Sequence, residues 1–138
     1  MISFNYNTQF KLPIEKEIQE WISNVIQSEN FKEGEISYIF CEDDELIKIN
    51  KEYLDHNTYT DIISFDYSVG KKLHGDIFIS IERVYDNAKT FKQNFFTELY
   101  RVVIHGVLHY CGYKDKSEED AQLMRQKEDF YLNKLKLN

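Results

Sequence analysis

The fold centres on residues 102–111, which read Val-Val-Ile-His-Gly-Val-Leu-His-Tyr-Cys and are apolar or aromatic except at the two histidines and Gly106. The run belongs to a helix that we expect over residues 95–111. A helix that is apolar almost all round is usually buried. The pattern therefore predicts a central helix, which the rest of the chain must surround.

The residues before and after this helix predict the remaining elements. Apolar and polar residues alternate in four segments, which indicates strands at residues 2–6, 36–40, 63–67 and 77–81. Apolar residues at helical spacing predict further helices at residues 14–25, 43–54, 84–91 and 117–131. The order is β-α-β-α-β-β-α-α-α, and the last two strands form a hairpin around Gly70. We expect one α+β domain over residues 1–138 with a mixed four-stranded sheet.

Composition restricts the function. The chain has 138 residues, of which 42% are hydrophobic and 30% charged, and its net charge is −7. Such a composition is typical of a globular protein with one core. Proteins that bind nucleic acid regardless of sequence are usually basic, so a nucleic-acid role here needs a local basic patch or a larger partner. Candidates for such a patch are Lys71, Lys72, Lys89, Lys92, Lys114 and Lys116.

Localisation is predicted from what the sequence lacks. No run of about 18 apolar residues is present, so we expect no membrane span. The first ten residues have no basic start followed by an apolar run, which argues against a secretory signal. Cys41 and Cys111 are therefore expected to be free thiols, and the protein to be cytoplasmic.

Two histidines and an aspartate have the spacing of a metal site. His105 and His109 are four residues apart, so their side chains project from one helix face. Gly112 is suited to end the helix and reverse the chain, which brings Asp115 back toward both imidazoles. Three protein ligands and an open position are characteristic of catalytic zinc. We predict one Zn²⁺ per chain, held by His105, His109 and Asp115.

The alternative is that the two histidines only pack or form hydrogen bonds. For an isolated pair at this spacing that interpretation is the more common one, but the glycine and the carboxylate favour metal. His56 and His74 are expected to lie in a loop or at a strand edge and not to bind the ion.

The reaction class follows from Gly106. Zinc lowers the pKa of bound water from about 15.7 toward about 7, which suits hydrolysis. Zinc proteases carry His-Glu-x-x-His with Glu as the general base, and here Gly106 stands in the Glu position. Peptide hydrolysis by that route is therefore disfavoured. Phosphodiester cleavage does not require a base there, and the sequence identifies no catalytic base elsewhere in the protein.

The string His105-Gly-Val-Leu-His109-x-x-Gly112-Tyr113 resembles the signature of the YbeY endoribonucleases, bacterial proteins that act in ribosomal RNA maturation. The resemblance extends over residues 36 to 135. It includes four further pieces, namely Asn50-x-x-Tyr53, Thr60-Asp61-Ile62-Ile63-Ser64-Phe65, Gly75-Asp76-Ile77-Phe78-Ile79-Ser80, and the pair Met124 and Glu128.

This resemblance implies a zinc-dependent, single-strand-specific endoribonuclease of small-subunit rRNA maturation and ribosome quality control. Its implied partners are single-stranded or ribosomal RNA and the ribosome or assembly factors, with no membrane. The sequence departs from the family pattern at three places. Lys114-Asp115 replaces Asp-His, so the third ligand becomes a carboxylate. Leu54 replaces an Arg that could contact phosphate, and Tyr59 replaces a Pro.

Two further points are open from the sequence. We expect Thr60, Asp61 and Ser64 to line the cleft or to orient a ligand, whereas the alternative is that Asp61 and Asp76 cap turns or pair with Lys or Arg. Two other functions fit the same residues. One is a non-catalytic ribosome-assembly factor that metal only stabilises, and the other is a metal-dependent hydrolase of another substrate.

Overall fold

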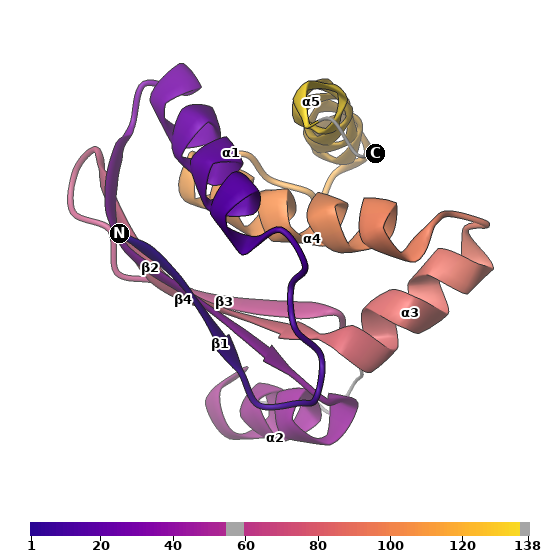
Figure 1. Ribbon diagram of the computed structural model, residues 1–138. Coiled ribbons are helices and arrows are strands. Elements are labelled where there is room, and N and C mark those ends of the chain that lie inside the picture. Colours follow the sequence, from indigo (N-terminus) through magenta and orange to yellow (C-terminus); the bar gives the residue numbers. More distant parts are fainter. Residues whose placement is uncertain (55–59, 136–138) are drawn as a thin grey trace.

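A mixed four-stranded sheet forms the middle of the molecule, as expected (Figure 1). The computed structural model describes residues 1–54 and 60–135, and the side chain of Leu54 lies outside the described part. The strand order is β1-β2-β4-β3, and the first three of these are parallel, whereas β3 is antiparallel to β4. The strands are β1 (Ile2–Tyr6), β2 (Lys32–Cys41), β3 (Ile62–Asp66) and β4 (Lys72–Ser80).

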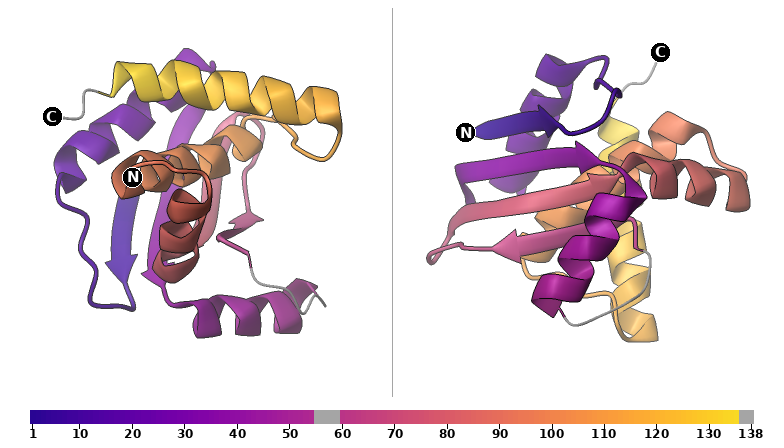
Figure 2. Two further views of the ribbon diagram at one scale, coloured as in Figure 1. Left: turned by 90° about the vertical axis from the view of Figure 1, so that its right-hand side faces the viewer. Right: turned by 90° about the horizontal axis from the view of Figure 1, so that it is seen from below.

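The described residues form five helices around this sheet, in the order that the sequence predicts. They are α1 (Glu15–Ser28), α2 (Asp43–Leu54), α3 (Ile81–Thr90), α4 (Phe95–Tyr110) and α5 (Glu118–Lys134). Figure 1 shows α1, α4 and α5 on one side of the sheet and α2 on the other. In the two views of Figure 2, α5 lies over α4, farther from the sheet.

The core lies between the sheet and α4, which is the predicted central helix. Ten of the sixteen residues of α4 are buried. They face a layer of fully buried strand residues that includes Tyr38 and Ile77. The Tyr38 hydroxyl donates a hydrogen bond of 2.8 Å to the Val103 carbonyl, so this buried phenol is satisfied by the helix backbone. Burying each large apolar side chain contributes roughly 1.5–3 kcal/mol.

Gly106 sets how closely α4 approaches the sheet. A Cβ at this position would lie 3.0 Å from Ile77 Cδ1 and 3.2 Å from Ile62 Cδ1. The helix therefore packs its glycine directly on strands β3 and β4. The contact of Gly106 with the sheet consequently fixes the position of the neighbouring His105 relative to β3.

Some sequence expectations concern residues that the structure does not describe. His56 and Tyr59 lie outside the described residues, as does the side chain of Leu54, so the effect of replacing the family Arg stays a prediction. Cys41 and Cys111 are free thiols, as expected. Within residues 1–54 and 60–135, no helix combines the length and the apolar character that crossing a bilayer requires.

Glu29 joins the first helix to the last part of the chain. It lies just after α1, and its carboxylate accepts hydrogen bonds from the hydroxyls of Tyr113, at 2.7 Å, and Tyr131. The Lys127 ammonium lies 3.4 Å from the same carboxylate. Trp21 adds a second link, because its indole N–H donates to the Tyr131 carbonyl at 2.9 Å. We call Glu29, Tyr113, Lys127 and Tyr131 the Glu29 cluster.

The Glu29 cluster makes stability depend on pH. Burial alone would raise the pKa of Glu29, but the hydrogen bonds from Tyr131 and Tyr113 and the charge of Lys127 outweigh burial and lower it below 4.5. A lowered pKa in the folded state stabilises the fold above the unfolded value, and this contribution is lost as pH falls through the folded value. We expect Glu29→Gln to lower the free energy of unfolding by about 1–2 kcal/mol at pH 7 and by less near pH 4. Urea unfolding at both pH values measures the difference, with the exposed Glu20→Gln as control. An equal loss at both pH values would contradict this account.

Candidate metal centre

The two histidines of α4 project side by side from the helix toward a pocket. Their ring centroids lie 4.6 Å apart, and the planes are nearly perpendicular at 82°. His105 is 19% exposed and His109 31% exposed at the side chain. Because the helix is fixed on the sheet at Gly106, both imidazoles have defined positions without any ligand.

A glycine-containing turn at the end of α4 brings the aspartate to them. Gly112 has φ +100°, a conformation that glycine adopts without strain. Its N–H donates to the His109 carbonyl at 2.9 Å, and the Tyr113 N–H donates to the Leu108 carbonyl at 3.1 Å, which is the Schellman arrangement. Asp115 Oδ2 then lies 3.1 Å from His105 Nε2 and 3.2 Å from His109 Nε2. The structure thus brings together the three side chains that the sequence predicted.

This arrangement fits a zinc ion. One ligand atom from each of the three residues lies within 4.8 Å of the other two. Two ligands of a tetrahedral zinc with bonds near 2.0–2.1 Å are roughly 3.3 Å apart, which is close to the observed separations from Oδ2. The donor set of two imidazoles and one carboxylate suits the same metal. The role of the three residues as ligands stays a prediction.

Glu128 orients the first of these histidines. Its Oε2 lies 2.6 Å from His105 Nδ1, and its side chain is only 5% exposed. A carboxylate only accepts hydrogen bonds, so Nδ1 donates a proton to Glu128, and Nε2 is the ring nitrogen that remains available to a metal once its own proton is displaced. Arg101 in turn holds Glu128 Oε1 at 3.0 Å and Asp129 at 2.7 Å. Metal-binding histidines commonly have such a carboxylate partner.

Electrostatics at His105 act in two directions. Burial lowers the pKa of His105, whereas the hydrogen bond to Glu128 and the charges of Glu128, Asp115 and Asp61 raise it, and the net result is a pKa above the ordinary 6.5. A metal at Nε2 must displace the second proton of this ring. Metal binding by this site is therefore weakened by acid.

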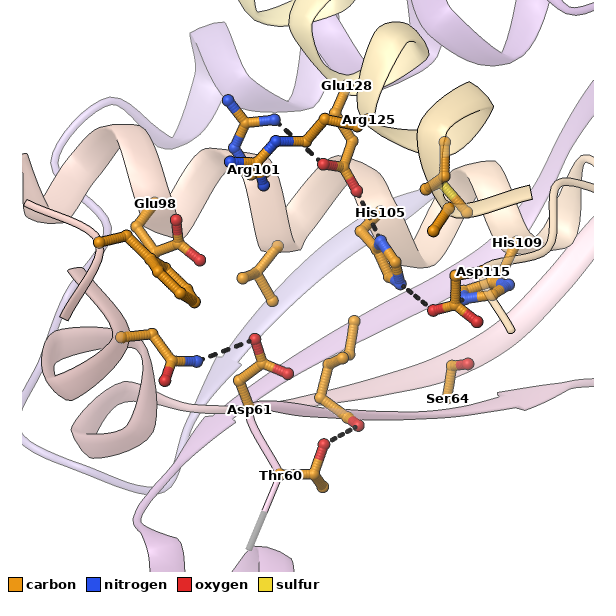
Figure 3. Close-up of a pocket in the computed structure, with 16 residues that line it drawn as sticks. Thr60, Asp61, Ser64, Glu98, Arg101, His105, His109, Asp115, Arg125 and Glu128 are labelled. Carbon is orange, nitrogen blue, oxygen red and sulfur yellow. Dashed lines mark hydrogen bonds and ion pairs between the residues drawn. The ribbon is translucent and has the colours of Figure 1, made fainter. Parts of the chain in front are cut away.

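The pocket beside the histidines has a volume of about 500 Å³ and is lined by residues of β3, α3, α4 and α5 (Figure 3). Thr60, Asp61 and Ser64 all line it. Asp61 accepts a hydrogen bond of 3.4 Å from the Asn87 amide, and its burial raises its pKa. Within the described residues no ion pair joins Asp61 to a Lys or Arg, and a role of Thr60, Asp61 and Ser64 in orienting a ligand stays a prediction. None of the six candidate lysines lines the pocket.

Sequence reasoning assigned no role at the site to the two residues that support His105, although Glu128 is part of the family resemblance. Arg101 precedes His105 by four residues and shares its helix face, which was a usable signal. Glu128 stands in the buried stripe of α5 with Met124 and Tyr131, and a carboxylate in such a stripe signals a buried partner. The sequence contains no direct sign that this partner is His105, because 23 residues separate the two.

The sequence is similar to known proteins over nearly its whole length. The sequence model of the family described as "Endoribonuclease YbeY" matches residues 2–136. The chain is 63% identical over 129 residues to the Endoribonuclease YbeY of Flavobacterium johnsoniae, covering 94% of this chain and 93% of that protein. It is 61% identical over 137 residues to the Endoribonuclease YbeY of Flavobacterium psychrophilum, covering 99% and 96%.

A solved structure shares the fold. The solution structure of TM1509 from Thermotoga maritima superposes with a TM-score of 0.71 at 25% sequence identity. The match covers 98% of this chain and 89% of that protein. The mixed sheet and the order of helices are therefore those of a known architecture.

The first prediction for the site concerns Asp115. Purified protein should contain close to one zinc per chain, and Asp115→Ala should lose most of it, because two imidazoles alone leave the ion without a third protein ligand. Asp115→His should retain zinc, since an imidazole is also a ligand. Elemental analysis after gel filtration measures this, with the exposed Asp44→Ala as control. Full zinc retention by Asp115→Ala would exclude this carboxylate as a ligand.

The second prediction concerns Glu128. Replacing it by Gln removes the charge that polarises His105, and we expect zinc affinity to fall about 10- to 100-fold. Competition with a chromogenic chelator gives the dissociation constant. Asp129→Asn is the matched control, because Asp129 contacts Arg101 and not His105, and its effect should be smaller. Equal affinities for wild type and Glu128→Gln would show that the orienting contact is unimportant.

Proposed function

The chain belongs to the YbeY endoribonuclease family, and on this premise we propose that it is a zinc-dependent, single-strand-specific endoribonuclease acting on ribosomal RNA in the cytoplasm. Its role would be the maturation of small-subunit rRNA and ribosome quality control, with the ribosome or assembly factors as partners. We also propose that residues 1–138 act as one catalytic domain. The observation that carries the proposal is the convergence of His105, His109 and Asp115 beside the pocket.

The side chains of this site would have different roles in the proposed reaction. His105, His109 and Asp115 would hold the ion, and Glu128 keeps the first imidazole in the tautomer that can bind it. A bound zinc ion would lower the pKa of water and offset the charge that develops on a phosphoryl oxygen. The pocket beside the three residues is where the strand would lie, bordered by β3 and α3.

Peptide hydrolysis receives no support from the structure. The position at which zinc proteases have their general base is Gly106, and a side chain there would meet Ile77 and Ile62 of the sheet. A glutamate at that position would therefore disturb the packing of α4. A non-catalytic assembly factor that metal only stabilises stays the alternative, motivated by Leu54 in place of the family Arg and by the net charge of −7.

The proposal is tested by cleavage of a labelled single-stranded RNA. We expect zinc-loaded protein to cut it, a chelator to stop cleavage and added zinc to restore it. His109→Ala should abolish cleavage, because it removes a ligand. His74→Ala is the matched control, since His74 lies on β4 outside the pocket and accepts a hydrogen bond from the Glu35 N–H. Cleavage that persists in His109→Ala would point to a contaminating nuclease, and an inactive but zinc-loaded wild type would refute the proposal.

A further inference from the structure

The pocket has an unusual balance of charge for an RNA-binding site. Its acidic lining comprises Asp61, Glu98, Asp115 and Glu128. Among the residues that the structure describes, two cationic side chains other than histidine line it, Arg101 and Arg125. A polyanion that enters the pocket meets these carboxylates and the net charge of −7 of the whole chain. The guanidiniums therefore decide whether a strand can bind there.

The two arginines differ in the contacts and in the exposure of their side chains. Arg101 is 12% exposed at the side chain, and both of its terminal nitrogens are engaged with Glu128 and Asp129. Arg125 is exposed, and within residues 1–54 and 60–135 it forms no hydrogen bond or ion pair. Glu98 acts on it only through the electrostatic field. Figure 3 shows Arg125 on the α5 side of the pocket, near Arg101 and Glu128.

An exposed aromatic ring borders the same pocket from another helix. Phe91 is the residue after α3, lines the pocket and is 53% exposed. Phe91 follows α3 and Arg125 lies on α5, two helices that Figure 1 shows on different sides of α4. A large apolar side chain at a polar pocket has no role in the core, and an aromatic face is a surface on which an unpaired base stacks.

We propose that Arg125 and Phe91 form the strand-binding subsite of this pocket, in which the guanidinium binds a backbone phosphodiester and the phenyl ring stacks on an unpaired base. The inference rests on the proposed nuclease function and assigns residues to its substrate binding. Guanidinium binds phosphate oxygens through two parallel hydrogen bonds. In a duplex the neighbouring bases cover both faces of each base, so only a single strand offers a face to Phe91. The subsite thereby gives a physical reason for single-strand selectivity.

The test distinguishes the phosphate contact of Arg125 from the base contact of Phe91 by comparing how tightly different strands bind. Binding to zinc-loaded protein is followed by fluorescence anisotropy with three labelled strands, all carrying 2′-O-methyl groups to block attack by the ribose. One is a normal single strand, the second has abasic positions at its centre, and the third is the normal strand in a duplex. Gel electrophoresis after each titration checks that the strands are intact.

The two variants should have different signatures. Arg125→Gln should lower the affinity for the normal and the abasic single strand by the same factor. It should also reduce the slope of log affinity against log salt concentration by about 0.7, the value for one phosphate contact on a single strand. Phe91→Leu should lower the affinity for the normal single strand by at least about fivefold and leave the affinity for the abasic strand unchanged. Phe91→Tyr, which keeps an aromatic ring, should bind the normal strand like wild type. Neither change should alter zinc content.

Matched controls use residues outside the pocket. Lys16→Gln removes one charge from α1, and Phe130→Leu removes one exposed ring from α5, where Phe130 is 50% exposed. Both should bind all three strands like wild type. If wild type binds and cuts single-stranded RNA but neither variant changes binding, the subsite is refuted and the nuclease function stands. If wild type neither binds nor cuts, the proposed function falls and the subsite with it.

Discussion

The contact of α4 with the sheet at Gly106 is the constraint on which the rest of the molecule depends. The absence of a side chain lets the helix lie directly on Ile62 and Ile77. A helix held at this distance buries most of its surface and directs the imidazoles of His105 and His109 toward the one side left open, between α3 and α5. The same glycine excludes the general base of a zinc protease. Gly106 thus determines both how closely α4 packs on the sheet and which general base the helix lacks.

Much of the fold could be predicted because its signals are local. Strand alternation and helical spacing identified, in order, the helices and strands of the described residues, and the hairpin of β3 and β4 followed from a short turn around Gly70. The triad of His105, His109 and Asp115 was also predictable, since helix geometry and one glycine relate residues only ten positions apart. The burial of α4 followed from its composition.

The rest of the candidate site depends on tertiary contacts, which the spacing of residues in the sequence does not reveal. The contact of Glu128 with His105 requires α5 to cross α4 at one particular place. None of the six lysines named as candidates for a basic patch lines the pocket, whereas Arg125 reaches it from α5, and residue spacing does not show which exposed charges the packing of helices brings together. Asp115 would also have an electrostatic effect as the third ligand. A carboxylate would leave the zinc site with one positive charge fewer than a third imidazole, so attraction of a polyanion would rely more on the nearby guanidinium.

The Glu29 cluster has a consequence for how the site is completed. Glu29 belongs to the first quarter of the chain, yet it is bonded to Tyr113 in the turn that carries Asp115 and to Tyr131 on the final helix. Glu128, the partner of His105, lies on that same helix. A growing polypeptide that has already formed its sheet and α4 still lacks the carboxylate that contacts His105 Nδ1. The support of this imidazole is therefore completed only after α5 has been synthesised and has docked on α4, which makes it a late event in the folding of the chain.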